Sequence, residues 1–183
     1  NRSYGKGNKR KIVDSMSGDI LFKNEDGKYS NVAAEAGIFQ GTIGYGLGLA
    51  ISDINNDGYP DIYIGNDFFE NDYLYINQKD GTFKEIISED DTKLGHTTHF
   101  SMGNDIADFN NDGALDLLSG GKLFQNTTRD KAWLEIHLQG DGVEVNRSAV
   151  GAQVRITVGK TTYTRQVEAG TGEGNQNDTR LHF

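Results

Sequence analysis

The chain has 183 residues, enough for one domain or two small ones, and its 24 glycines beside a single proline indicate a folded, turn-rich protein. Its formal net charge of −9 argues against a nucleic-acid partner, because phosphate binding requires a basic surface. The sequence has no cysteine, which excludes disulfides and thiolate zinc sites. No apolar run approaches the roughly 20 residues of a membrane span, so we expect no membrane insertion.

The N-terminal segment, residues 1–17, is polar and carries a basic cluster. This cluster consists of Lys6, Lys9, Arg10 and Lys11. We interpret it as a solvated tail, the usual state of a short charged run. In residues 21–32, which follow, "DG" separates two short segments, a pattern typical of a β-hairpin. Residues 31–38, "NVAAEAGI", are expected to form one or two helical turns.

Short apolar segments separated by Gly, Asn and Asp dominate the centre of the chain and predict strands. We expect strands at 46–52, 61–66, 72–77, 82–87, 104–108, 115–120 and 122–126. Aligning Gly48 with Gly103 superposes two copies of one unit, and "LYIN" at 74–77 recurs more weakly as "LFQN" at 123–126. A period of about 50 residues with four short strands per unit predicts β-propeller blades over residues 18–130. The predicted fold class is therefore all-β.

The character of the sequence changes after a boundary that we place near 129–131. Apolar and polar residues alternate in 132–138, 152–158 and 162–168. Such alternation predicts strands with one buried face, and 139–148 is expected to be a loop. We therefore expect a small C-terminal β unit over residues 131–183.

Two acidic segments share one skeleton: "DINNDGYPD" at 53–61 and "DFNNDGALD" at 108–116. In both, oxygen-bearing side chains occupy the first, third, fifth and ninth places, glycine the sixth, and the seventh residue offers its backbone carbonyl. The candidate ligands are Asp53, Asn55, Asp57, Tyr59 and Asp61 in the first segment, and Asp108, Asn110, Asp112, Ala114 and Asp116 in the second.

This spacing predicts two calcium sites. Calcium takes about six to eight hard oxygen ligands, which alternate residues of a tight turn can supply, and glycine permits the sharp bend. Magnesium fits less well because it prefers a strict octahedron with retained waters. The segments are not EF-hands, since the twelfth places hold Ile64 and Ser119 rather than glutamate. The structural alternative is a pair of Asx-rich turns that cap their own backbones, although that alternative does not explain the repeated spacing.

These residues carry a resemblance to two families. The "DxNxDGxxD" segments between short strands resemble the FG-GAP/VCBS repeat of integrin α-type propellers and many bacterial surface proteins. Residues 149–183, preceded by "AWLEIHL" and "NRS", resemble the ASPIC/UnbV domain, and together the two resemblances cover about residues 18 to 183. The positions that match this second family are Asn146, Arg147, Gly151, Ala152, Gln166, Val167, Gly170, Gly172, Gln176, Asp178, Leu181, His182 and Phe183.

The resemblance implies a non-catalytic, calcium-linked, adhesive module that is secreted, periplasmic or on the cell surface. Its expected partner is a glycan or protein ligand on a cell surface or in a matrix. The chain holds fewer than three blade units, whereas closed propellers need about four or more. We therefore expect an incomplete propeller, either a fragment or a shortened version, whose C-terminal unit is truncated relative to the family. A scaffold that binds the rest of its own propeller is a further hypothesis.

An enzymatic alternative rests on "HTTH", in which His96 and His99 could share a metal ion in a propeller-type lyase or hydrolase. The sequence lacks the glutamate of the HExxH motif, so two loop histidines on a propeller rim are the simpler interpretation. A second alternative is a sugar-stacking platform of aromatic residues. Its members would be Phe68, Phe69, Tyr73 and Tyr75, although alternate strand positions favour a place in the core.

Overall fold

The computed structural model describes residues 7–68, 70–88, 100–128 and 132–183. Within these residues the chain is all-β, with short antiparallel strands and one 3-10 helix, η1 (Gly7–Lys11). The strands are β1 (Phe22–Glu25), β2 (Lys28–Asn31), β3 (Gly46–Ser52), β4 (Asp61–Asn66), β5 (Tyr73–Asn77), β6 (Phe83–Glu85), β7 (Asn104–Ala107), β8 (Asp116–Ser119), β9 (Lys122–Phe124), β10 (Glu135–Ile136), β11 (Gln153–Val158), β12 (Thr161–Gln166) and β13 (Leu181–His182). The strands predicted from the sequence are present, with shifts of one to three residues at their ends, except that the strand predicted at 132–138 is confined to β10.

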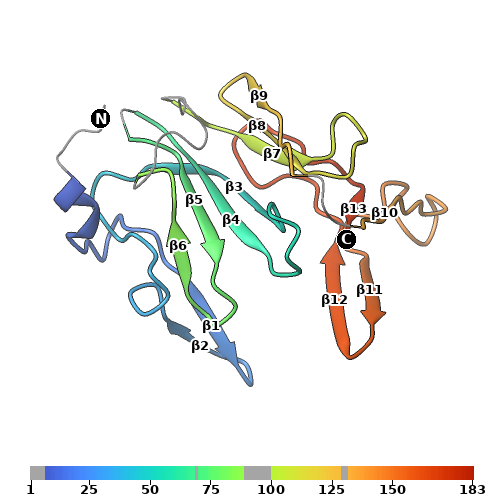
Figure 1. Cartoon of the computed structure of the whole chain (residues 1–183), viewed down its shortest axis with the longest axis horizontal. Coiled ribbons are helices and arrows are strands. Elements are labelled where there is room, and N and C mark those ends of the chain that lie inside the picture. Colours follow the sequence, from blue (N-terminus) through green and yellow to red (C-terminus); the bar gives the residue numbers. More distant parts are fainter. Residues whose placement is uncertain (1–6, 69, 89–99, 129–131) are drawn as a thin grey trace.

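The central element is a four-stranded meander in the order β3-β4-β5-β6 (Figure 1). Its register pairs Ala50 with Tyr63, and Tyr63 in turn with Leu74. A second meander, β7-β8-β9, follows with the same succession of strands, and β7 lies beside β3. This arrangement is that of two neighbouring propeller blades, and the predicted incomplete propeller-like fold is confirmed.

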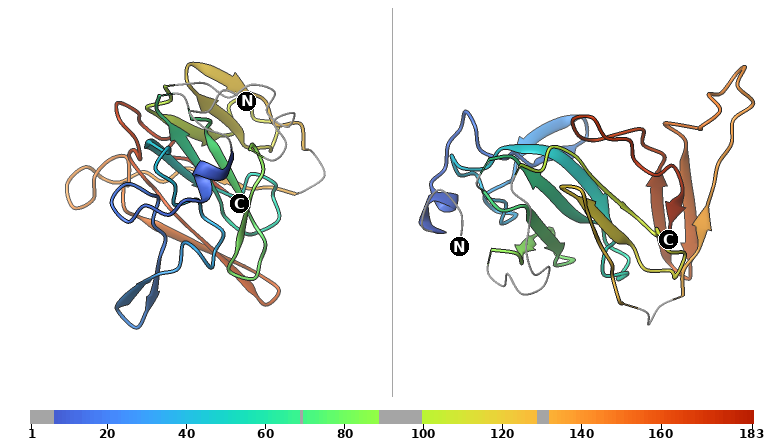
Figure 2. Two further views of the ribbon diagram at one scale, coloured as in Figure 1. Left: turned by 90° about the vertical axis from the view of Figure 1, so that its left-hand side faces the viewer. Right: turned by 90° about the horizontal axis from the view of Figure 1, so that it is seen from above.

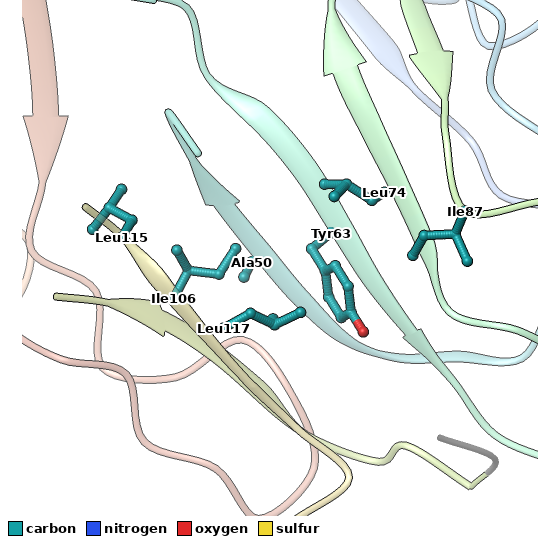
Figure 3. Close-up of a cluster of buried hydrophobic side chains, with 7 residues drawn as sticks. All are labelled: Ala50, Tyr63, Leu74, Ile87, Ile106, Leu115 and Leu117. Carbon is teal, nitrogen blue, oxygen red and sulfur yellow. The ribbon is translucent and has the colours of Figure 1, made fainter. Parts of the chain in front are cut away.

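One hydrophobic core joins these two blades. The first blade contributes Ala50, Tyr63, Leu74 and Ile87, and the second contributes Ile106, Leu115 and Leu117 (Figure 3). Residues two apart on β4 and β8 point to the same face of their sheet, which explains why alternate positions enter the core. The packing of one sheet face on the next is what fixes the two acidic segments on neighbouring blades.

The opposite face of the central blade packs on the segment at 33–39. Tyr73 and Tyr75 are buried there against Ala33, Ala36 and Ile38. The Tyr75 hydroxyl accepts a hydrogen bond of 3.0 Å from the Phe39 amide. The two tyrosines therefore belong to the core, as their strand positions favoured, and do not form a sugar-stacking platform.

The helical turns expected at 31–38 do not form a helix. The segment makes successive hydrogen-bonded turns, and the amide of Ala36 donates to the carbonyl of Val32 at 2.8 Å. Gly37 then adopts a φ of 79°, which reverses the chain before another turn can add. The segment crosses the face of the central blade, where the small side chains of its alanines allow it to pack closely on Tyr73 and Tyr75.

A buried carboxylate links the two blades at one end of the core. The Asp72 carboxylate accepts hydrogen bonds from the Tyr63 hydroxyl at 2.5 Å and from the Ser101 and Ser119 hydroxyls at 3.1 Å each. The Asn66 amide donates to the same side chain at 2.9 Å. Burial raises the pKa of Asp72, and these donors oppose that rise by stabilising the charged form.

The basic N-terminal cluster is not a solvated tail throughout, which corrects the expectation for Arg10. The Arg10 side chain is 5% exposed, and its Nη2 lies 2.6 Å from Oε1 of Glu70, which is fully buried. Arg10 Nε donates to the same oxygen at 3.1 Å. Lys11, one residue later, is exposed. Arg10 thus anchors η1 to the loop between β4 and β5.

The C-terminal unit contains two small sheets, β10-β13 and β11-β12, and lies at the opposite end of the molecule from η1 (Figures 1 and 2). Its segment 171–175 runs along the inner strands of both blades. The Leu49 amide donates to the Thr171 carbonyl at 2.9 Å, and the Asn175 side-chain amide donates to the Asn104 carbonyl at 2.7 Å. The unit therefore covers strand edges that would otherwise be open to pairing with another chain.

Replacing Arg10 by alanine is expected to destabilise the fold by about 3–5 kcal/mol, because the Glu70 carboxylate would remain buried without its partner. Urea unfolding of Arg10→Ala and of its exposed neighbour variant Lys11→Ala measures the difference. Adding Glu70→Gln to Arg10→Ala should recover part of the loss by removing the buried charge. Equal midpoints for Arg10→Ala and Lys11→Ala would show that the ion pair does not hold η1 in place.

Candidate metal-binding loops

Loop 1 (residues 53–61) connects β3 to β4, and loop 2 (residues 108–116) connects β7 to β8. In loop 1, the Asp53 carboxylate accepts hydrogen bonds from the amides of Asp57 at 2.8 Å and Gly58 at 2.6 Å. In loop 2, the Asp108 carboxylate accepts the equivalent bonds at 3.0 Å and 2.7 Å, from the amides of Asp112 and Gly113. The first aspartate of each loop therefore holds the turn closed by accepting hydrogen bonds from the amides of the fifth and sixth residues.

The middle of each loop repeats the same pattern. The Asp57 amide donates to Asn55 Oδ1 at 3.1 Å, and the Asp112 amide donates to Asn110 Oδ1 at 3.0 Å. Asp57 Oδ1 accepts from the Tyr59 amide and Asp112 Oδ1 from the Ala114 amide, both at 3.0 Å. The sequence repeat therefore encodes a repeated three-dimensional turn.

The backbone conformation agrees between the loops. Asn56 and Asn111, in the fourth place, have φ values of 53° and 57°. Gly58 and Gly113, in the sixth place, have φ values of 93° and 87°. Asparagine tolerates the left-handed region better than most residues and glycine tolerates it best, so both identities follow from the turn.

The last aspartate of each loop starts the following strand and bonds to the end of the next hairpin. Asp61 accepts from the Asn77 amide at 2.9 Å, and Asp116 accepts from the Asn126 amide at 2.8 Å. Asn126 also donates its side-chain amide to the carbonyl of Ile54 in loop 1 at 2.9 Å, which ties loop 1 to the second blade. Sequence reasoning missed these two asparagines, although each ends the repeated "LYIN" or "LFQN" segment.

Burial sets the electrostatics of both loops. Asp53, Asp61, Asp108 and Asp116 are 6%, 0%, 2% and 1% exposed. Burial raises the pKa of Asp61 to about 6, since amide hydrogen bonds from Asn77 and Ile54 offset only part of the desolvation, and the charges of Asp53 and Asp57 raise it further. A buried carboxylate is stable as an anion only when it is paired, hydrogen-bonded or bound to a cation.

Among the residues that the structure describes, two basic side chains approach loop 1. Lys79 Nζ lies 3.2 Å from Asp57 Oδ2, and Arg165 Nη2 lies 3.8 Å from Asp53 Oδ2. Neither side chain was singled out in the sequence, because Lys79 belongs to the β5–β6 turn and Arg165 to β12. Near loop 2, Arg180 Nη1 donates to Asn111 Oδ1 at 3.2 Å, but Asn111 is not one of the predicted ligands.

The donors of both loops fit a hard divalent cation in their chemistry. Each hydrogen-bonded carboxylate oxygen has a second lone pair, so an amide bond does not prevent it from binding a cation. Within the described residues, no three His, Cys, Asp or Glu side chains are already gathered in metal-binding geometry. A cation would therefore depend on asparagine and carbonyl oxygens as well, which are ligands that calcium accepts.

The C-terminal unit contacts both loops at their glycines. A methyl group on Gly58 would lie 2.8 Å from Cε1 of Tyr163, and one on Gly113 would overlap the indole of Trp133. Beside loop 1 the two parts enclose a cavity of about 480 Å³ that is lined by Asp57, Trp133 and Tyr163, among others. The loops are therefore part of the interface between the blades and the C-terminal unit.

Of the remaining candidates, only Phe68 lies in the part of the chain that the structure describes. His96, His99 and Phe69 lie outside the described residues. Phe68 is part of a surface cluster with Tyr45, at 4.9 Å between ring centroids. None of the segments that the structure describes forms a helix long and apolar enough to cross a membrane.

Comparison with known proteins gives matches to both parts of the chain. The family model described as "FG-GAP-like repeat" matches residues 53–119, and the one described as "ASPIC and UnbV" matches residues 142–183. Cartilage acidic protein 1 of Xenopus tropicalis is 38% identical over 91 residues, which is 50% of this chain and 13% of that protein. The resemblance inferred from the motifs is confirmed. Both families are modules of the extracellular, adhesion type and not enzyme types.

Replacing Gly58 by alanine is expected to destabilise the fold by about 2–3 kcal/mol, since the new methyl meets both a left-handed backbone and the Tyr163 ring. Gly27→Ala is the matched control, because Gly27 has a φ of 82° with nothing near its methyl position. This control should lose only about 1 kcal/mol. Chemical unfolding measures both.

Tyr163→Ala provides the second half of this test. In that background, Gly58→Ala should lose no more stability than Gly27→Ala, because the ring is gone. An undiminished loss would show that Tyr163 does not pack on loop 1 in solution.

Proposed function

Since the chain carries an FG-GAP-like repeat followed by an ASPIC/UnbV segment, we propose that it is a non-catalytic, calcium-binding module of a secreted, periplasmic or cell-surface protein. Each loop binds one calcium ion, which acts structurally. The module supports adhesion by binding a glycan or protein ligand on a cell surface or in a matrix.

The observation that carries this proposal is the pair of equivalent turns with buried carboxylates. Asp108 and Asp116 are nearly inaccessible and make their hydrogen bonds to backbone amides, and no described basic side chain forms an ion pair with either. A dication bound beside these carboxylates would neutralise their charge, which the amides only hydrogen-bond. Ordinary Asx turns on a surface do not require two buried carboxylates in the first and ninth places.

The structural role follows from where the loops lie. Each loop joins two hydrogen-bonded strands of one blade and also contacts the C-terminal unit. A cation bound in either loop would hold the turn, the strand ends and this interface in one arrangement. The alternative of a metal-dependent lyase or hydrolase rests on His96 and His99, which lie outside the described residues.

Calcium is expected to raise the midpoint of thermal unfolding more than magnesium, and EDTA is expected to lower it. At a concentration of about 100 times the dissociation constant, the gain is about 2.7 kcal/mol per site. Asp57→Ala and Asp112→Ala should each abolish about half of the gain. Asp80→Ala, which removes an exposed Asx-turn carboxylate outside the loops, is the control and should retain all of it. A midpoint indifferent to every ion would rule out the calcium sites.

The calcium effect at loop 1 is expected to weaken below about pH 6. Without metal, the raised pKa of Asp61 means that the folded state loses stability as the pH rises from about 4 to about 6. Calcium binds the carboxylate form and so must displace the proton, which reverses this dependence. At pH 5 the apparent affinity should fall about tenfold, and the stabilisation by about 1.4 kcal/mol.

Isothermal titration with calcium between pH 5 and pH 8 measures this dependence, with the Asp112→Ala variant isolating loop 1. Asp61→Asn should bind more weakly and lose the pH dependence, since it has no proton to displace. A flat profile in the Asp112→Ala variant would show that Asp61 does not ligate the ion.

A further inference from the structure

Two positively charged side chains, Lys79 and Arg165, lie against the carboxylates of loop 1 among the described residues. They come from different parts of the chain. Lys79 belongs to the same blade, and its side chain is 48% exposed. Arg165 belongs to the C-terminal unit, and its side chain is 19% exposed. Solvent screens the lysine contact more strongly, so Arg165 contributes the larger part of the field at the loop.

Contacts within its own unit hold Arg165 in place. Its Nε donates to the His182 carbonyl at 3.3 Å, and its Nη1 donates to the Thr164 carbonyl at 3.2 Å. The guanidinium carbon lies over the Phe183 ring, 5.5 Å from the centroid. These contacts do not involve loop 1. The contacts that place the positive charge beside Asp53 are therefore independent of the loop.

The Asp53 oxygen that faces Arg165 is also part of the candidate ligand set. Asp53 Oδ2 accepts the Gly58 amide at 2.6 Å and has the guanidinium 3.8 Å away. A calcium ion in the loop would share this carboxylate with a fixed positive charge. A metal dication and a guanidinium a few ångströms apart repel each other even when water screens them.

We propose that Arg165 of the C-terminal unit lowers the affinity of loop 1 for calcium by competing with the ion for the Asp53 carboxylate. This inference rests on the calcium role proposed above. Linkage makes the effect reciprocal, so calcium in loop 1 weakens the contact between Asp53 and the β11–β12 hairpin by the same factor. The C-terminal unit thus acts as an internal regulator of one calcium site.

The test uses a pair of substitutions that separate charge from shape. Arg165→Gln and Arg165→Lys both lose the planar guanidinium, but only the lysine variant keeps the charge. Arg155→Gln is the control. Arg155 is exposed on β11, the neighbouring strand of the same hairpin, and its partner in the strand register is Thr164. Calcium affinity is measured by isothermal titration in an Asp112→Ala background, which leaves loop 1, and in an Asp57→Ala background, which leaves loop 2.

In the Asp112→Ala background, Arg165→Gln should raise the calcium affinity about three- to tenfold, the effect of one partly screened charge. Arg165→Lys and Arg155→Gln should leave it within about twofold. The gain should shrink at high salt and be absent in the Asp57→Ala background. Circular dichroism and the metal-free unfolding midpoint verify that each variant folds.

The outcomes distinguish the two proposals. If neither background binds calcium, the proposed function itself fails. If loop 1 binds calcium but Arg165→Gln has the affinity of the parent, the regulatory role of Arg165 is overturned and the calcium sites remain. If Arg165→Lys gains as much as Arg165→Gln, the effect comes from packing against Phe183 and not from charge, which also overturns the inference.

Discussion

The fold depends on how each blade makes its tight turn between the first two strands. A turn of this length leaves backbone amides without strand partners, and they need acceptors inside the loop. Asp53 and Asp108 provide these acceptors at distances of 2.6–3.0 Å, which places their carboxylates below the surface. The turns lie directly beside the first residue pairs of β3 with β4 and of β7 with β8, and the negative charge of the loops follows from the acceptors that their amides need.

Local patterns in the sequence predicted much of this structure because its decisive contacts are local. The hydrogen bonds of the first, third and fifth residues of loop 1 join residues two to five apart, so the nine-residue skeleton contains most of what the turn needs. The bonds from Asn77 to Asp61 and from Asn126 to Ile54 span 16 and 72 residues and were not predicted. The burial of Arg10 could not be predicted in this way, since its partner Glu70 is 60 residues away. The helix expected at 31–38 does not form for a related reason, because packing on Tyr73 and Tyr75 outweighs the helical preference of its alanines.

The loops were predicted as ligand sets, whereas the structure shows that they are also interface surfaces. Gly58 and Gly113 provide the bend, and their lack of a side chain admits Tyr163 and Trp133 of the C-terminal unit. Each of these glycines thus satisfies two requirements, one from backbone conformation and one from packing. Spacing revealed only the first, because the second depends on residues that lie about 20 to 105 positions later in the chain.

Equivalent backbone geometry does not make the two loops equivalent sites. The turns agree in hydrogen bonds and in φ, but their electrostatic surroundings differ. Asp53 has the fixed guanidinium of Arg165 beside it, whereas no described basic side chain forms an ion pair with its counterpart Asp108. A repeat can therefore preserve the geometry of a turn while its neighbours give each copy a different electrostatic environment. In this chain the neighbour at loop 1 is the C-terminal unit, so under the proposed calcium role the binding of an ion and the contact with that unit depend on each other.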